Sequence, residues 1–135
     1  MMSREGRRGS WDVEISVVRV GDLVLTRADA EGSARLSRAL HDARAASPHD
    51  EQQLPGKQAG LLAFLMRHHR QIVSKSRLIE AVWGLDGAAP SVVDVHMTRL
   101  RHALQRLDAS GAWVRIETRR GMGYALHVDE VESGK

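Results

Sequence analysis

The 135-residue sequence contains no cysteine and no long apolar run. The lack of cysteine excludes a disulfide framework and every zinc finger that uses cysteine ligands. No segment approaches the roughly 18 consecutive apolar residues of a transmembrane helix. The first ten residues carry charge without an apolar stretch behind them, so they do not form a secretory signal. We therefore expect a cytoplasmic protein with no membrane partner.

Patterns of metal sites and active sites are also missing from the sequence. Among the seven histidines, the adjacent pair His68 and His69 would point about 100° apart on a helix and make a poor ligand pair, and no HExxH motif is present. Gly121 and Gly123 precede a strand-like run, whereas a phosphate-binding glycine loop opens a helix. No nucleophile, base and acid form a catalytic pattern. The sequence predicts no metal, no cofactor and no enzymatic activity.

Positive charge is concentrated in the second part of the chain. Residues 1–53 hold 8 basic and 9 acidic side chains, whereas residues 54–128 hold 11 basic and 5 acidic ones. The length and the apolar content of 42% indicate one folded domain with a modest core. Basic surface on such a domain suits a polyanionic partner, although most charged surfaces are simply solvated.

We expect a domain at residues 12–128, a flexible tail at residues 1–11 and a second tail at residues 129–135. Residues 14–20 and 23–25 are β-rich and are split by a Gly-Asp pair, which predicts a hairpin.

Residues 28–53 form an atypical insert with many Ala, Arg, Ser and Asp residues. Within the insert, Ser33 is expected to cap a short helix whose one side carries Leu36, Leu40 and Ala43.

Two further helices are predicted after the insert. Residues 57–69 place leucines and a methionine at overlapping helical spacings. Ser74 stands as an N-cap before an amphipathic run that reaches Trp83, and Gly84 provides the C-terminal stop. Residues 86–90 contain glycine and proline and are expected to form a loop.

The third helix, residues 91–107, has the clearest periodicity. Ser91 and Asp94 match a capping box. One apolar stripe is predicted to face the core and consists of Val93, Met97, Leu100, Leu104 and Leu107. The opposite face is predicted to be exposed and carries Val95, Thr98, Arg99, His102 and Arg106. A flank between them carries Asp94, Arg101 and Gln105.

Residues 113–128 are predicted to form a two-stranded ribbon. Residues alternate in polarity over 114–119 and again over 124–128, and Gly121 and Gly123 predict a tight turn between the two runs. A helix that can fill a major groove, followed by a basic ribbon that can reach the next groove, is typical of a DNA reader.

This order of strands, three helices and hairpin resembles the winged-helix DNA-binding domain of OmpR/PhoB-type response regulators. The resemblance rests on IVSKSRLIEAVWG at residues 72–84, VVDVHMTRLRHAL at residues 92–104, and IETRRGMGYAL at residues 116–126, which contains Arg-Gly-x-Gly-Tyr. It covers about residues 15–128. It implies an α+β fold, namely a winged helix-turn-helix with N-terminal antiparallel strands, a three-helix core and a C-terminal β-hairpin wing.

In that family the third helix enters the major groove, and the wing reaches the neighbouring minor groove. By matching position, the resemblance implies that the helix faces DNA with Val95, Thr98, Arg99 and Arg101. It also implies that Arg120 enters the minor groove, that Thr118 contacts the backbone, and that Trp83 lies near the phosphates.

The chemistry of single side chains favours the same interpretation, although each could also be a solvated surface residue. Arg99 and Arg120 are the main candidates, because the guanidinium fork matches guanine O6 and N7 or a phosphate. Val95 could pack on a thymine methyl group. The further candidates for DNA contact, mostly at phosphates, are Lys75, Arg77, His102, Arg106, Arg115 and Arg119.

The chain departs from the family pattern in three ways. Thr98 stands where many members have arginine. The segment over residues 32–53 is longer than the family's short connection, which leaves open whether the N-terminal sheet has its usual four strands. Residues 1–53 cannot hold the receiver domain that normally precedes this module.

The leading hypothesis is a sequence-specific regulator of transcription that binds double-stranded DNA. The alternative is a winged-helix adaptor or antirepressor with weak or no DNA binding, suggested by Thr98 and by the insert at residues 28–53. The stripe containing Leu36 could instead build a dimer interface. RNA polymerase and a second copy of the chain are further candidate partners. The chain could also be part of a longer protein.

Overall fold

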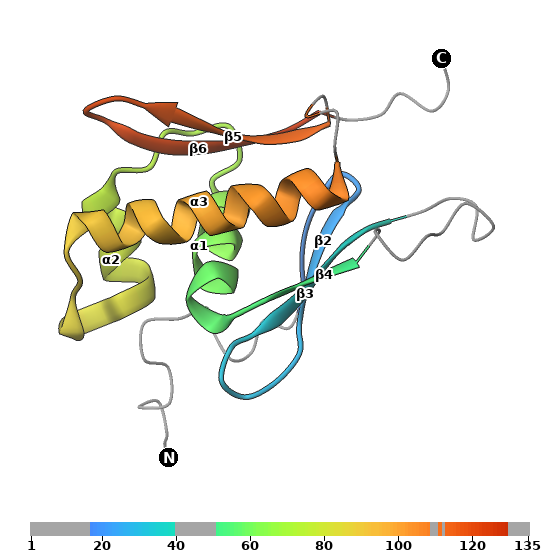
Figure 1. The fold of residues 1–135 in the computed structure, drawn as a ribbon, viewed down its shortest axis with the longest axis horizontal. Coiled ribbons are helices and arrows are strands. Elements are labelled where there is room, and N and C mark those ends of the chain that lie inside the picture. The colour runs from blue at the N-terminus through green and yellow to red at the C-terminus, as the bar shows by residue number, and fades with distance from the viewer. Residues whose placement is uncertain (1–16, 40–50, 109–110, 112, 130–135) are drawn as a thin grey trace.

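The computed structural model describes residues 17–39, 51–108, 111 and 113–129 (Figure 1). A four-stranded antiparallel sheet in the order β1-β2-β3-β4 consists of β1 (Val17–Val20), β2 (Leu23–Arg27), β3 (Ala34–Arg38) and β4 (Glu51–Leu54). The helical elements are α1 (Gly56–Arg67), α2 (Lys75–Trp83), the 3₁₀ turn η4 (Gly84–Asp86) and α3 (Pro90–Leu107). A separate hairpin consists of β5 (Val114–Arg119) and β6 (Gly123–Val128). The predicted α+β winged-helix fold is confirmed.

The first predicted hairpin is present, but the predicted helix after Ser33 is wrong. Residues in this region form strand β3, which pairs with β2 on one side and β4 on the other. Leu36 is completely buried and its neighbour Arg35 is exposed, which is the alternation of a half-buried strand. Backbone hydrogen bonds on both sides of β3, together with the burial of Leu36, outweigh the weak helix propensity of the segment. The insert thus completes a four-stranded sheet.

The burial of Leu36 in β3 removes one reason for expecting a protein interface at residues 28–53. A side chain with no exposed surface, as Leu36 has, cannot contribute to an interface with a partner in this fold. Leu40 and Ala43, the other members of the predicted stripe, lie outside the described residues, as do the predicted tail at residues 1–11 and residues 130–135.

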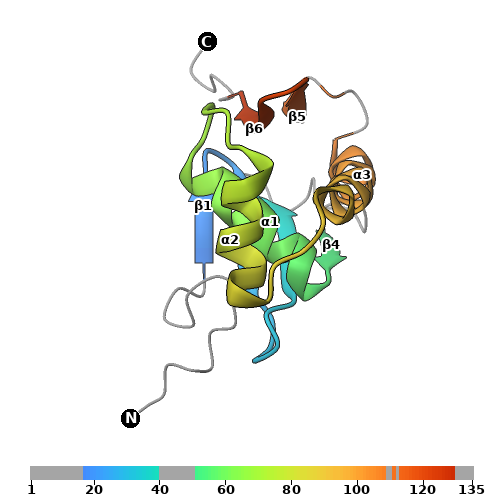
Figure 2. The same ribbon diagram turned by 90° about the vertical axis from the view of Figure 1, so that its left-hand side faces the viewer.

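The helices begin and end largely where the sequence predicts. Ser74 Oγ accepts a hydrogen bond of 3.2 Å from the backbone N–H of Arg77, and Gly84 ends α2 with a φ of 62°. Figure 2, which looks nearly along α3, shows α1 and α2 beside each other below the hairpin. Among the helices that the structure describes, none has the length and apolar character needed to cross a bilayer.

The amino-terminal end of α3 differs from the prediction. The helix begins at Pro90, its N-cap is Ala89, and no side chain caps it. Ser91 therefore lies inside the helix, and the predicted capping box is wrong, because proline with its fixed φ favours the first helical position. The Asp94 side chain instead contacts Lys75 and Tyr124. The predicted core stripe is confirmed, since all five of its side chains are buried.

Strand β6 of the β5–β6 hairpin is hydrogen-bonded to the connection between α1 and α2. Val73, in the connection between α1 and α2, exchanges backbone hydrogen bonds of 2.7 and 2.9 Å with Tyr124. A Cβ atom on Gly123 would lie 2.0 Å from the Val73 carbonyl oxygen, so only glycine permits this close approach. Asp129, the first residue of the predicted second tail, still donates its backbone N–H to the Trp113 carbonyl at 2.7 Å.

Candidate nucleic-acid interface

Helix α3 presents one exposed face, here called the outer face, which consists of Val95, Thr98, Arg99, His102 and Arg106. The predicted exposure of all five residues is confirmed. Because their spacing follows the helical repeat, they project from one side of a cylinder that fits a major groove. Val95 is 48% exposed despite its apolar side chain.

The side chains of the outer face differ in whether they form hydrogen bonds within the protein. Thr98 Oγ1 donates to the Asp94 carbonyl oxygen at 3.1 Å, and Arg106 Nε donates to Gln52 Oε1 of β4 at 2.9 Å. Arg99 has no hydrogen bond or ion pair with any described residue, and neither has His102. The guanidinium of Arg99 is therefore available for an external partner.

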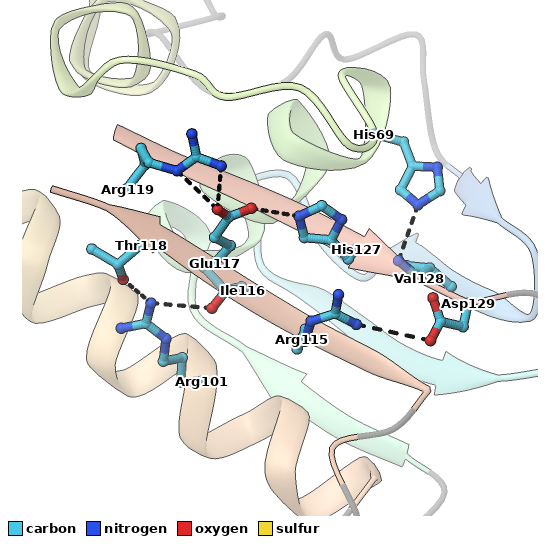
Figure 3. A network of polar contacts seen from close by, with 10 residues as sticks. All are labelled: His69, Arg101, Arg115, Ile116, Glu117, Thr118, Arg119, His127, Val128 and Asp129. Atoms are coloured by element: carbon cyan, nitrogen blue, oxygen red, sulfur yellow. Dashed lines mark hydrogen bonds and ion pairs between the residues drawn. The ribbon is translucent and has the colours of Figure 1, made fainter. Parts of the chain in front are cut away.

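Arg101 lies on the flank of α3 and bonds to the hairpin rather than facing outward. Its Nη2 donates to the Ile116 carbonyl oxygen at 3.2 Å and to Thr118 Oγ1 (Figure 3). Its guanidinium carbon lies 5.7 Å from the centre of the Tyr124 ring. Arg101 and Thr118, both predicted to contact DNA, thus bond to each other and connect α3 with β5.

Asp94 forms a second connection between α3, α2 and the hairpin. Both carboxylate oxygens lie 3.0 Å from Lys75 Nζ, and the hydroxyl of Tyr124 donates a hydrogen bond to Oδ1. The hydrogen bond from Tyr124, followed by Lys75, holds the pKa of Asp94 below its usual value. Burial, followed by the Asp94 contact, raises the pKa of Tyr124 to about 12. Lys75, predicted as a phosphate contact, therefore has an internal partner.

The strands of the hairpin carry charges that compensate one another. Arg119 donates to Glu117 Oε2 from Nε at 3.0 Å and from Nη2 at 2.7 Å, and His127 Nε2 lies 2.8 Å from Glu117 Oε1 (Figure 3). The hydrogen bonds from Arg119 and then His127 lower the pKa of Glu117. Arg115 lies 3.8 Å from the Asp129 carboxylate. The charges of both strand arginines are thus partly neutralised before any DNA approaches.

The tip of the hairpin presents Arg120 without such compensation. The Met122 N–H donates to the Arg119 carbonyl oxygen at 2.9 Å, and Gly121 has a φ of 77°, as a tight turn requires. Arg120 is exposed and has no hydrogen bond or ion pair within the described part of the chain. Met122 beside it is 56% exposed. The turn holds one free guanidinium at the end of a thin ribbon.

A groove of about 560 Å³ separates the hairpin tip from the beginning of α2. Four side chains with hydroxyl groups line it, namely Ser74, Ser76, Thr118 and Tyr124. Its charged lining is mainly basic and comprises Lys75, Asp94, Arg119 and Arg120. Hydroxyl and guanidinium donors of this kind bind phosphate oxygens.

Trp83 packs within the protein at the far end of α2. Its ring centre lies 5.6 Å from that of His96, and Lys57 Nζ lies 5.4 Å from it. Burial, followed by the charges of Arg99 and Lys57, lowers the pKa of His96, which keeps this imidazole neutral. His96 is half-buried beside Trp83. Arg77, another predicted phosphate contact, is exposed and its guanidinium carbon lies 5.6 Å from the Phe64 ring centre.

Sequence reasoning missed the polar connections between α3 and the hairpin. Asp94 and Tyr124 lie 30 positions apart, and Arg101 and Thr118 lie 17 apart, so no local spacing relates them. Lys57 was also missed, because its place next to Trp83 depends on how α1 and α2 pack. Among the described residues, no three His, Cys, Asp or Glu side chains gather in a way that could hold a metal ion.

Comparison with curated proteins gives relatives that share this module and extend beyond it. The chain is 41% identical over 81 residues to the heme response regulator HssR of Staphylococcus saprophyticus, which covers 59% of this chain and 35% of that protein. It is 42% identical over 74 residues to HssR of Staphylococcus aureus strain Newman, covering 54% of this chain and 32% of that protein. The chain thus matches about a third of the length of these relatives.

Solved structures show the same architecture. The DNA-binding domain of Escherichia coli CadC superposes with a TM-score of 0.63 at 28% identity, covering 85% of this chain and 94% of that one. The C-terminal domain of the nisin resistance regulator NsrR gives 0.59 at 28% identity, covering 84% and 99%. The sequence model of the family described as "Transcriptional regulatory protein, C terminal" matches residues 49–126. Since this match spans more than half of the chain, the protein belongs to that family, the OmpR/PhoB-type DNA-binding domains of transcriptional regulators.

Proposed function

We propose that this DNA-binding domain reads double-stranded DNA by placing α3 in a major groove and the hairpin tip in the neighbouring minor groove. The observation that carries the proposal is the pair of unengaged guanidinium groups, Arg99 on the outer face and Arg120 at the tip. An arginine fork suits guanine O6 and N7 in the major groove, and arginine is favoured in a narrow minor groove.

The DNA strand that separates these two grooves would pass between α3 and the hairpin tip. The groove of about 560 Å³ between the hairpin tip and the beginning of α2, where Asp94 of α3 also lines it, would supply hydroxyl and basic groups for phosphate oxygens. His102 on α3 and Arg77 on α2, which are both exposed, would add phosphate contacts. Such contacts fix the register of the protein on the duplex without reading its sequence.

The predicted DNA contacts whose side chains already bond within the protein would mainly position α3 and the hairpin. Arg101, Thr118 and Lys75 hold α3, α2 and the hairpin at a fixed separation through their side-chain contacts. Trp83 braces α3 through His96. Arg106 and Arg119 would reach DNA only by giving up or sharing their contacts with Gln52 and Glu117.

RNA polymerase is the proposed protein partner, and its contact would be the turn η4 between α2 and α3. Leu85 in this turn is fully exposed, so its apolar side chain is available to a protein partner. A Leu85→Ala variant should therefore bind DNA normally and activate transcription poorly in a purified system. Normal activation by this variant would remove Leu85 from the contact.

We also propose that two copies bind adjacent half-sites, which sedimentation on duplexes with one or two half-sites would test.

Selection from a pool of random duplexes at several salt concentrations tests the proposed function. The expected result is a defined motif, bound with an affinity that falls steeply with salt, with a slope of about −0.9 for each phosphate neutralised. Salt-sensitive binding without a motif would contradict sequence-specific reading. An absence of binding would leave the adaptor alternative.

A further inference from the structure

One face of the β5–β6 hairpin holds a carboxylate that two basic side chains share. Glu117 and Arg119 lie two positions apart on β5, so their side chains project from the same face of the strand. His127 of β6 lies on that face too, because its register partner is Arg115 (Figure 3). Arg119 donates to Glu117 Oε2 from Nε and Nη2, and His127 Nε2 lies 2.8 Å from the other oxygen, Oε1. Each carboxylate oxygen thus has its own basic partner.

The three side chains differ in how far they reach toward solvent. The His127 side chain is 19% exposed and that of Glu117 is 31% exposed, whereas that of Arg119 is 52% exposed. Arg119 also lines the groove of about 560 Å³ beside the hairpin tip, and neither of the other two residues lines it. Of the three, Arg119 is therefore the one placed to meet a DNA phosphate in that groove.

Contact with a phosphate competes with the bonds that Arg119 makes to Glu117. Two of its donors point at Oε2, and a phosphate would need these donors to be given up or shared. The attraction between Arg119 and Glu117 depends on the negative charge of the carboxylate, and a second cation at Oε1 offsets part of that charge. Histidine is the side chain that ordinarily gains a positive charge between about pH 8 and about pH 5. His127 occupies the position from which such a charge would act.

Other charged or titratable groups surround this contact, from β5, from the chain after β6, and from the connection between α1 and α2, namely Arg115, Asp129, His69 and Arg70. The first two form an ion pair of 3.8 Å with each other. His69 Nε2 accepts the Val128 N–H at 3.0 Å, and Arg70 is exposed. The hydrogen bonds from Arg119 and then His127 lower the pKa of Glu117, so this carboxylate stays ionised while a histidine titrates.

Resting on the proposed contact of the hairpin with DNA, we propose that His127 is a positioning residue that couples DNA binding to pH. When His127 is protonated, its ion pair with Glu117 loosens the bonds between Glu117 and Arg119, and Arg119 becomes available to a DNA phosphate. When His127 is neutral, Glu117 holds Arg119 within the protein. DNA binding therefore favours the protonated form, and affinity rises as the pH falls through the range in which histidine titrates.

Fluorescence anisotropy with the selected duplex, at constant ionic strength and at about pH 8 and about pH 5.5, tests this coupling. His102 is a proposed phosphate contact and also a histidine, so every protein carries His102→Gln to remove its charge. We expect binding to be about three- to fivefold tighter at the lower pH, the upper part of the range for a partly exposed ion pair. His127→Gln should abolish this gain. The control, His68→Gln, changes the half-buried histidine at the end of α1 and should keep it.

Two further variants separate the coupling from the mere addition of a positive charge near DNA. Arg119→Ala removes the group that is released, so its affinity should no longer depend on the charge of His127. Glu117→Gln releases Arg119 permanently, so binding should already be tight at about pH 8 and should gain nothing from acid. If both variants keep the full gain, His127 acts on DNA directly and the proposal is overturned.

The Arg119 Nε–H signal in ¹⁵N NMR spectra reports on the same change without DNA. It should move as the pH falls in the His102→Gln protein and stay fixed once His127→Gln is added. A signal that stays fixed in both proteins would overturn the proposal even where DNA is bound. If the signal moves but no duplex is bound at either pH, the proposed function is wrong, and the coupling of His127 to DNA binding falls with it.

Discussion

The Tyr124 hydroxyl of β6 donates a hydrogen bond to the Asp94 carboxylate of α3, and this bond joins the hairpin to the helix that carries the outer face. Lys75 binds the same carboxylate from the beginning of α2. Three elements therefore meet at one side chain. The separation between Arg99 and Arg120, which decides whether both can reach one duplex, depends on this junction.

Removing the Tyr124 hydroxyl tests the junction. Tyr124→Phe keeps the buried ring but deletes the bond to Asp94, so we expect the free energy of unfolding to fall by about 1–2 kcal/mol. DNA binding should weaken while the preferred motif stays the same, because no base-facing group is lost. Urea unfolding and binding to the selected duplex measure both effects. Unchanged stability and affinity would show that the junction does not position the hairpin.

The pKa of Tyr124 can be read without interference from other phenols, because the chain has one tyrosine. Its pKa is raised to about 12 by burial and then by the Asp94 carboxylate, above the ordinary 10.0. The stabilising contribution is therefore complete below pH 10 and is lost as the pH rises toward 12. Ultraviolet absorption against pH should give a midpoint near 12, and a lower one in Asp94→Asn. An identical midpoint in both proteins would exclude the contact.

Asp94 has the opposite dependence on pH. Its pKa is lowered below 3.8 by Tyr124 and Lys75, so its contribution to stability is complete above that pH and is lost as the pH falls through the lowered value. In Asp94→Asn this loss should be absent from the acid limb of a stability curve. A curve of the same shape in variant and wild type would contradict the assignment.

The two glycines of the hairpin turn should differ in their tolerance of alanine. In Gly123→Ala the new Cβ would meet the Val73 carbonyl oxygen at 2.0 Å, so we expect a loss of roughly 3 kcal/mol or more. In Gly121→Ala no atom lies within 4 Å, and only the positive φ of 77° costs stability, about 1–2 kcal/mol. Thermal or urea unfolding of the pair provides the comparison. Equal losses would mean that the close approach to Val73 is not what requires Gly123.

Substitution of the two free arginines should have separable effects on DNA binding. Arg99→Ala should weaken binding by about 1–3 kcal/mol and relax the preference at one base pair. Arg120→Ala should lower affinity and reduce the salt slope by about one. Arg19→Ala, in strand β1, provides the control and should leave both unchanged. An Arg99→Ala protein with full affinity and the same motif would remove Arg99 from base reading.

Periodic features of the sequence predicted the fold well. The buried stripe of α3 and its exposed opposite face repeat every three to four residues, and this local pattern survives in the structure because one side of the helix must be buried. The N-cap predicted at Ser74 is present, whereas the one predicted at Ser91 is not. At the latter position proline starts the helix, and the long-range partners Lys75 and Tyr124 engage the carboxylate that was assigned to a cap.

The strand β3 and the engaged arginines could not be predicted in the same way. The strand containing Leu36 is specified by its two neighbours in the sheet, and one of these, β4, follows only after a long connection. Whether an arginine is free or engaged depends on which side chain lies opposite it. Arg101 and Arg120 look equivalent in sequence, yet the first bonds to Thr118 and the second has no partner among the described residues.

Dimethyl sulfate footprinting on the selected duplex shows whether one protein molecule occupies two adjacent grooves. The reagent methylates guanine N7 in the major groove and adenine N3 in the minor groove, so one experiment reports on both. We expect protection of guanine N7 under α3 and of adenine N3 in the neighbouring minor groove, and we expect Arg120→Ala to lose only the second protection. Protection confined to one groove, or a minor-groove footprint that survives in Arg120→Ala, would contradict this expectation.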